Sequence, residues 1–289
     1  MIKRFTIYGE RCSGTNYIEK LILKNFDVKL TWEFGYKHFF GFSNFENSDD
    51  VLFIGIIRNP FEWLNSFYKN PWELPAHLIE NVDSFLNSEF YSVHNPNPSN
   101  IYYKVDKPTE CLEDRNIYTG DRYVNVFEMR YTKINFLKND MPNKVNNFIL
   151  IRYEDLLDNF ENTMNSFLKF GLKYKSNPPV NVFGYKGVSG QKYVKKTYND
   201  ISENKIYNHK YFNKRIESEF NYITWNIVKW ILYSSTCFET VINDFIELFT
   251  FEYSLINAFL CGCISAETSY ILSMLVNDFG FKHGAKNDK

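Results

Sequence analysis

The sequence predicts an α/β protein with a central parallel sheet flanked by helices, and with a helical C-terminal extension. Three apolar runs, at residues 5–8, 51–57 and 148–151, predict strands. The second and third runs are apolar throughout, as expected of strands that are covered on both faces. Each run leads into a short polar turn and then into apolar positions at helical spacing. Repeated strand–turn–helix order with such strands indicates a parallel sheet.

The first strand runs into a small polar loop, Gly9–Thr15, which precedes apolar positions at helical spacing. Backbone N–H groups of such a loop and the positive end of the following helix can bind an anion together. The first turn after a strand is also the usual ligand position in open α/β sheets. Gly9 and Gly14 are separated as in a P-loop, but Thr15 stands where a P-loop has its Lys. The loop therefore predicts a single phosphate-like group rather than a nucleoside triphosphate, with a purely structural turn as the alternative.

A second anion site is predicted where the second strand ends. Arg58 follows that strand directly, and Ser66 lies about two turns into the helix that begins near Pro60. An Arg and a hydroxyl that converge at a strand end suit a phosphate group. The alternative is an Arg that binds a carbonyl group and a Ser on a solvated helix face.

The third strand leads into Arg152-Tyr153-Glu154-Asp155 and then into a helical pattern up to Leu168. Gly171 is a natural end for that helix, and Asp155 suits the first turn of a helix. A later loop carries the sequence Lys186-Gly187-Val188-Ser189-Gly190, in which glycines allow close approach to a ligand and cations flank them. A solvated basic loop is the alternative for that segment.

Two domains are expected, an α/β domain over 1–230 and a helical extension over 231–289. Residues 70–146 are rich in proline and predict an irregular insertion with helices over 80–91 and 124–137. An insertion at the ligand edge of a sheet often forms the substrate wall.

Composition narrows the class of protein further. A net charge of −1 gives no overall attraction to nucleic acid, and the five cysteines follow no zinc-ligand spacing. No carboxylate pair suggests a metal, so no metal is expected. The cysteines are scattered along the chain, as is typical of reduced thiols. The first strand is expected to begin near Met1, with no visible signal peptide. Both features predict a cytoplasmic protein. The apolar segment Tyr253–Val276 contains Glu267 and Asn257, so we expect no membrane span there.

Taken together and in this order, the three motifs and the Tyr-Glu-Asp turn resemble the sulfotransferase family. That family uses 3′-phosphoadenosine 5′-phosphosulfate (PAPS) as its donor. The similarity covers roughly Phe5 to Trp225, with unmatched insertions. It implies a P-loop NTPase-like fold, nucleotide binding, and transfer of a sulfuryl group to a hydroxyl acceptor without a metal.

The resemblance also implies donor-binding residues. Ser13–Asn16 would hold the 5′-phosphosulfate, Tyr17 and Tyr153 would contact the adenine, and Arg58 with Ser66 would hold the 3′-phosphate. The loop at Lys186 would close over that phosphate. The full implied set is Gly9, Arg11, Cys12, Ser13, Gly14, Thr15, Asn16, Tyr17, Arg58, Ser66, Tyr153, Lys186 and Gly187.

The sequence departs from the family pattern at Cys12, where the family commonly has Lys. Arg11 is therefore the candidate for the cation that stabilises the bridging oxygen, with Lys37 as a second candidate. Cys12 is interpreted as a small packing residue, or alternatively as a thiol with a low pKa at a helix N-terminus. His38 follows Lys37 and stands 20 residues before Arg58, where the family often has its catalytic base. A core histidine is the alternative, and Glu10 is an alternative base.

Two other functions stay open on the sequence alone. A P-loop small-molecule kinase would need a magnesium-binding Asp after a strand, but Asp49 and Asp50 precede one. A catalytically inactive sulfotransferase-like binding or scaffold protein would fit the missing Lys at Cys12. The acceptor can be a glycan, a peptide tyrosine or a small phenol, and the oligomeric state is not predicted.

Overall fold

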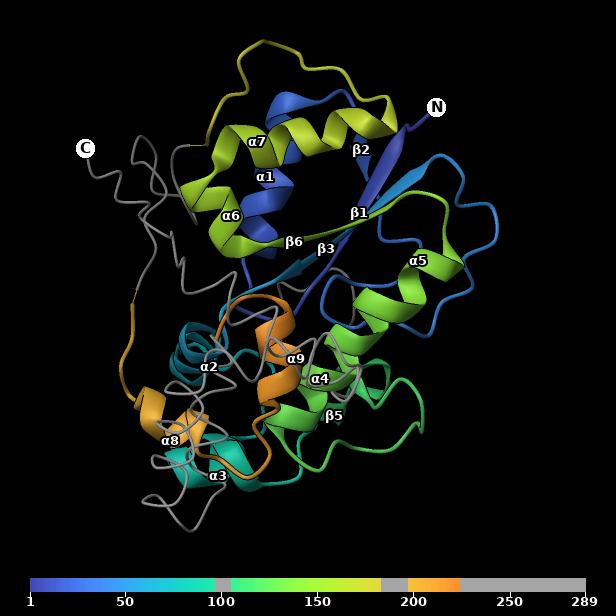
Figure 1. The fold of residues 1–289 in the computed structure, drawn as a ribbon. Helices are drawn as coiled ribbons and strands as arrows, with labels where there is room; N and C mark the ends of the chain where they lie inside the picture. Colours follow the sequence, from blue (N-terminus) through green and yellow to red (C-terminus); the bar gives the residue numbers. More distant parts are fainter. Residues whose placement is uncertain (97–104, 183–196, 224–289) are drawn as a thin grey trace, which may run out of the picture. The chain divides into compact units, whose positions relative to one another are not determined.

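The computed structural model describes residues 1–96, 105–182 and 197–223. Its centre is a sheet of four parallel strands in the order β2-β1-β3-β6 (Figure 1). These strands are β1 (Arg4–Tyr8), β2 (Lys29–Leu30), β3 (Val51–Ile57) and β6 (Phe148–Arg152). Helices cover both faces, so the predicted α/β class with a central parallel sheet is confirmed.

The pleat of the strands divides the core into two sides. All seven residues of β3 are buried. Leu52, Ile54 and Ile56 belong to the core on one face, while Val51 and Phe53 belong to the core on the other. Because side chains alternate along a strand, a strand covered on both faces must be apolar at every position. This explains why the sequence revealed the strand so clearly.

One face of the sheet is covered by α1 (Thr15–Asn25), α6 (Tyr153–Asp158) and α7 (Phe160–Asn165) (Figure 1). The single helix expected up to Leu168 is interrupted at Asn159, and its last turn, η4 (Ser166–Phe170), is a 3₁₀ helix. The predicted end is confirmed, because Gly171 follows η4 with a left-handed φ of 78°.

The other face packs against α4 (Val126–Asn135), the π-helical turn η3 (Phe136–Asp140) and α5 (Met141–Lys144). The helix α2 (Pro60–Lys69) begins directly after β3 and packs in a neighbouring core. Its N-cap Asn59 accepts hydrogen bonds from the backbone amides of Phe61 and Glu62, and Pro60 occupies the first turn. This cap fixes where Arg58 leaves the strand.

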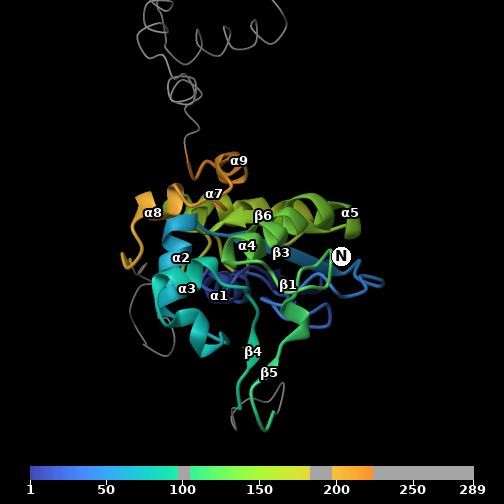
Figure 2. The same ribbon diagram turned by 90° about the horizontal axis from the view of Figure 1, so that it is seen from below.

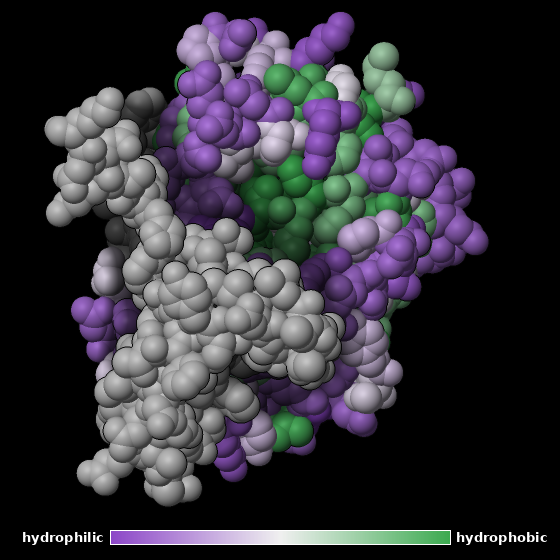
Figure 3. All heavy atoms as spheres, in the orientation of Figure 1, coloured by the Kyte–Doolittle hydropathy of each residue, from purple (hydrophilic) through white to green (hydrophobic). Residues whose placement is uncertain are grey.

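The edge strand β6 is only half covered. Its residues alternate between buried and half-buried, and Figure 3 shows apolar surface in the region of β6, between α6–α7 and α5.

The insertion contains the two expected helices in shorter form, as α3 (Val82–Asn87) and α4. It also contains structure that the sequence did not predict. The 3₁₀ turns η1 (Ala76–Ile79) and η2 (Leu112–Asp114) flank a hairpin of β4 (Val93–His94) and β5 (Thr109–Glu110). Figure 2 shows this hairpin projecting from the body of the domain.

Two short helices, α8 (Glu203–Tyr207) and α9 (Lys214–Glu219), complete the described part of the chain. The predictions for Lys186, Gly187, the extension over 231–289 and the segment Tyr253–Val276 concern residues outside the described part of the chain. Within the described residues, no helix combines the length and the apolar character that crossing a membrane requires.

A buried ion pair joins α9 to α4, close to the end of β3. Arg130 Nε and Nη2 donate to the two carboxylate oxygens of Glu217 at 2.7 and 2.9 Å, and Nη2 also donates to the carbonyl oxygen of Arg58 at 2.9 Å. The side chains of Arg130 and Glu217 are 2% and 0% exposed. The two buried charges therefore compensate each other, and the Arg58 carbonyl and the Tyr131 side chain add further contacts.

We expect Arg130→Met to lower the free energy of unfolding by about 3–5 kcal/mol, because it leaves the carboxylate of Glu217 buried without its cation. The double variant Arg130→Met/Glu217→Leu should recover most of that loss, since it removes both charges. Urea unfolding measures both effects. A single variant that is as stable as the double variant would contradict this account.

Candidate functional site

The loop between β1 and α1 is wound tightly at the carboxyl end of the sheet. Gly14 is the N-cap of α1 with a left-handed φ of 99°, and Cys12 has a φ of 65°. The Ser13 amide and hydroxyl both donate to the carbonyl oxygen of Glu10, at 3.1 and 2.5 Å. A Cβ atom on Gly14 would lie 2.4 Å from the ring of Tyr153. The two predicted elements, loop and Tyr153, are therefore in direct contact.

The segment that carries Lys37 and His38 lies beside the start of this loop. The Gly9 amide donates to the carbonyl oxygen of Lys37 at 2.9 Å. His38 Nδ1 lies 2.7 Å from the carbonyl oxygen of Gly9. Since a carbonyl oxygen only accepts, this contact requires Nδ1 to carry the proton, and it leaves the lone pair of a neutral imidazole on Nε2.

The surroundings of His38 keep its imidazole neutral. It is buried, and burial together with the positive charges of Lys37, Arg11 and Lys133 holds its pKa well below the ordinary 6.5, against the opposing effect of its bond to Gly9. The imidazole is therefore neutral at neutral pH. Tyr36 and Trp72 lie edge-on to it, with ring centroids 5.5 and 6.0 Å away. Trp72 comes from the insertion, which supports the expectation that the insertion borders this site.

Lys37 is the cation that the structure brings to the loop. Its Nζ donates to Oδ1 of Asn16 and lies 3.5 Å from a carboxylate oxygen of Glu19. Burial lowers the pKa of Lys37, and Glu19 opposes that shift. The side chain is 10% exposed, so its charge is poorly screened by water.

The prediction for Arg11 needs correction. Its guanidinium points away from the loop interior into the insertion, where Nη2 donates to Asp114 at 2.8 Å and Nη1 to the hydroxyl of Ser92 at 2.7 Å. The carbon of the guanidinium also lies 4.8 Å from the ring centre of Phe67. With its side chain 2% exposed, Arg11 is committed to these partners and is not placed to stabilise a bridging oxygen.

Arg11 belongs to a group that we call the buried charge cluster: Glu10, Arg11, Asp114 and Lys133. Lys133 Nζ bonds to Asp114, lies 2.9 Å from Glu10 and donates to the carbonyl oxygen of His38 at 2.8 Å. Two negatively charged and two positively charged side chains leave the cluster without a net formal charge. Burial lowers the pKa of Lys133, but Asp114 and Glu10 outweigh it, so the net shift is upward and the ammonium keeps its proton.

Glu10 occupies the edge of this cluster. Burial raises the pKa of its carboxyl against the attraction of Lys133. Within the described residues, Oε2 of Glu10 has no hydrogen-bond partner. The sequence offered Glu10 as an alternative base, but its ion pair with Lys133 supports a role in holding the loop. Sequence reasoning missed Asp114 and Lys133, because no motif surrounds either residue.

The predicted 3′-phosphate residues do lie next to the loop. Arg58 Nη1 donates to the carbonyl oxygen of Cys12 at 2.9 Å, and its guanidinium lies 5.0 Å from the ring centre of Tyr153. Cys12 Sγ lies 3.6 Å from the carbonyl oxygen of Ser66. Within the described residues, the buried Nε of Arg58 has no hydrogen-bond partner. Three predicted residues thus adjoin the loop, namely Arg58, Ser66 through its carbonyl oxygen, and Tyr153.

The two tyrosines predicted to contact adenine are core residues in this structure. Tyr17 and Tyr153 are 2% and 1% exposed, and their rings meet edge-on at 6.3 Å. The Tyr17 hydroxyl donates to Oδ1 of Asn181 at 2.9 Å. Neither ring offers an open stacking surface here.

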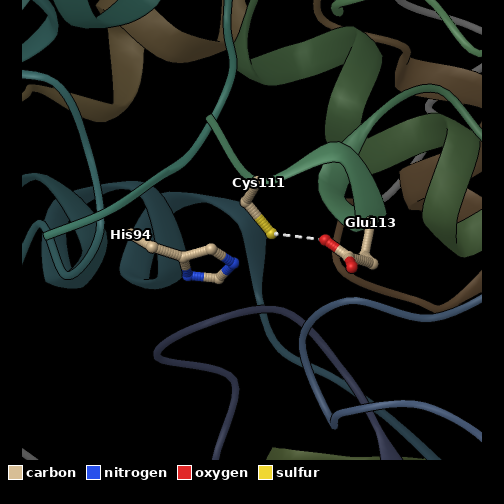
Figure 4. Close-up of side chains that lie close together, drawn as sticks. All are labelled: His94, Cys111 and Glu113. Carbon is tan, nitrogen blue, oxygen red and sulfur yellow. Dashed lines mark hydrogen bonds between the residues drawn. The ribbon is translucent and has the colours of Figure 1, made fainter. Parts of the chain in front are cut away.

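A separate cluster could hold a metal ion. Donor atoms of His94, Cys111 and Glu113 all lie within 4.8 Å of one another, and Figure 4 shows their side chains converging. The side chain of His94 is 13% exposed. Only the register of the unpredicted β4–β5 hairpin could have revealed this group.

The chain was compared with known protein families and with characterised proteins. No family model matches the chain, and no curated protein matches it. The function must therefore be argued from the geometry above.

We expect Gly14→Ala to destabilise the protein more than Gly171→Ala, because both glycines have a left-handed φ but only Gly14 is in contact with a ring. At Gly171 an added Cβ would meet nothing within 4 Å. The control should cost about 1 kcal/mol from backbone strain, and Gly14→Ala should cost roughly 2–4 kcal/mol. Equal losses in urea unfolding would show that Tyr153 does not fix the loop.

Proposed function

We propose that this protein is a sulfotransferase that moves a sulfuryl group from PAPS to a hydroxyl acceptor, on a P-loop-like α/β fold. One observation carries the proposal: a Gly-bracketed loop at a helix N-terminus is contacted by Lys37, His38 and Arg58. Lys37 reaches the side chain of Asn16, His38 binds the carbonyl oxygen of Gly9, and Arg58 binds that of Cys12. A base, a cation and a second anion site thus adjoin one anion-binding turn.

The loop Ser13–Asn16 would hold the 5′-phosphosulfate through its amides and the positive end of α1. Arg58 and Ser66, which adjoin Cys12 from the side of α2, would hold the 3′-phosphate. Two anion sites on neighbouring strands suit a nucleotide with two separate anionic ends. Lys186 and Gly187 keep their predicted role as a closing loop.

The proposed chemistry uses the tautomer of His38. Nε2 takes the proton of the acceptor hydroxyl while Nδ1–H stays bound to Gly9. The acceptor oxygen forms a bond to sulfur as the bond from sulfur to the phosphate oxygen breaks. The products are a sulfate ester and 3′-phosphoadenosine 5′-phosphate. Lys37 stabilises the charge that develops on the leaving phosphate oxygen, the role first expected of Arg11.

The kinase alternative is less well supported. Asp50 pairs with Arg4 through a 2.6 Å contact, and Arg4 begins β1, at the end of the sheet away from the loop. Asp50 is therefore not placed to hold magnesium at the loop. The inactive scaffold alternative rests on the absence of Lys at position 12, but Lys37 offers a cation at the same loop from a different segment.

We expect Arg58→Ala to weaken binding of 3′-phosphoadenosine 5′-phosphate by roughly 2–4 kcal/mol, because it removes a charge-assisted phosphate contact. Isothermal titration calorimetry measures the change. Arg215→Ala is the matched control, since Arg215 is 80% exposed and pairs only loosely with Glu219. Equal affinities of wild type and Arg58→Ala would remove Arg58 from the site.

We expect His38→Gln to keep nucleotide affinity and to lower turnover by 10²-fold or more. Because burial holds the His38 pKa below 6.5, the base stays deprotonated as pH falls to 6.5, and wild-type kcat/KM should decline only at lower pH. Formation of the bisphosphate product from PAPS, with a panel of hydroxyl acceptors, gives both readouts. The exposed His77, changed to Gln, is the control. Retained turnover in His38→Gln would exclude this base.

A further inference from the structure

The β4–β5 hairpin and the turn that follows it bring together three side chains that can bind a metal, those of His94, Cys111 and Glu113. Val93 pairs with Glu110 and His94 with Thr109, while the Cys111 amide donates to the carbonyl oxygen of Ser92 at 2.9 Å. In this register His94 and Cys111 project from the same face as diagonal neighbours, because alternate residues share a face. Glu113 follows two residues later in η2. An imidazole, a thiol and a carboxylate therefore converge from two adjoining segments.

Their spacing is close to that of a tetrahedral site. Cys111 Sγ lies 3.5 Å from Oε2 of Glu113, and all three donor atoms lie within 4.8 Å of one another. Zinc bonds of about 2.0–2.3 Å at tetrahedral angles put neighbouring donors about 3.3–3.6 Å apart. The sulfur–oxygen pair already has this separation, and the imidazole needs a shift of about 1 Å. Figure 4 shows the ring and the carboxylate on opposite sides of the sulfur, both turned toward it.

A fourth residue orients the imidazole. Nδ1 of His94 lies 3.5 Å from Oε1 of Glu73, and the Glu73 side chain is 6% exposed. In Figure 4 the ring nitrogen on the side of Cys111 is the one farther from the backbone, Nε2. A carboxylate on one nitrogen and a metal on the other is the usual arrangement for a metal-bound histidine.

The thiol of Cys111 is buried, and the Glu113 carboxylate lies 3.5 Å from its sulfur. A divalent cation that binds this sulfur replaces the thiol proton, which is released to solvent. A softer sulfur donor with nitrogen and oxygen donors suits zinc rather than magnesium or calcium.

We propose that His94, Cys111 and Glu113 bind one zinc-type divalent cation, with Glu73 as the residue that orients His94. Strands of two residues each do not hold a hairpin together by their own pairing. The cation would join its two sides where they meet the body of the domain. His94 lies 5.9 Å, between ring centres, from Phe39, which follows the candidate base His38. A cation bound there would stabilise the insertion beside the candidate active site.

The test uses the full-length protein, stripped of metal with a chelator under reducing conditions and then titrated with Co²⁺ as a spectroscopic probe and with Zn²⁺. We expect one cation per chain, with a near-ultraviolet thiolate-to-cobalt absorption that Zn²⁺ abolishes. Cys111→Ser should lose that absorption. Cys12 lies outside the cluster, so the matched control Cys12→Ser should keep the absorption.

Two more conservative variants test the site even if Cys111→Ser fails to fold. Glu113 is exposed, so Glu113→Gln should fold normally and bind Zn²⁺ at least tenfold more weakly. Glu73→Gln should weaken binding by 10–100-fold. Circular dichroism confirms that each variant is folded. The proposal is overturned if the wild type gives no thiolate–cobalt absorption, if that absorption survives Cys111→Ser, or if folded Glu113→Gln binds Zn²⁺ as tightly as wild type.

Discussion

The buried charge cluster is the constraint on which the candidate site depends. Glu10 and Arg11 belong to the first loop, and Asp114 and Lys133 belong to the insertion. Each charge would cost several kcal/mol to bury alone, so the four are stable only when loop and insertion are folded together. Lys133 also holds the carbonyl oxygen of His38. The loop and the candidate base are therefore positioned by residues about a hundred places away in the chain.

This dependence explains what the sequence could and could not predict. The strands were predictable because burial on both faces leaves a continuous apolar run, and the positions of Arg58 and the first loop follow from where those strands end. The partner of Arg11 was not predictable, because Asp114 lies 103 residues away in a segment without periodicity. The β4–β5 hairpin was missed for a similar reason, since two residues per strand give no alternating pattern.

The proposed cation lies on a different segment from the one that the family pattern predicts. The family pattern places a Lys beside the Ser-Gly-Thr sequence, where this chain has Cys12 with its sulfur 3.6 Å from a carbonyl oxygen of α2. Lys37 approaches the same loop from the connection between β2 and β3, next to His38. Lys37 and the candidate base His38 are adjacent residues, and two hydrogen bonds to Gly9 fix this segment. Their placement relative to each other therefore does not depend on position 12.

The most direct test of the proposed site is a crystal structure of the protein with 3′-phosphoadenosine 5′-phosphate. The account predicts the 5′-phosphate on the backbone amides of Ser13–Asn16 with Lys37 Nζ beside it, and the 3′-phosphate within hydrogen-bonding distance of Arg58. A nucleotide bound elsewhere, or a 5′-phosphate on the loop with Lys37 still turned to Glu19 and Arg58 unengaged, would contradict it.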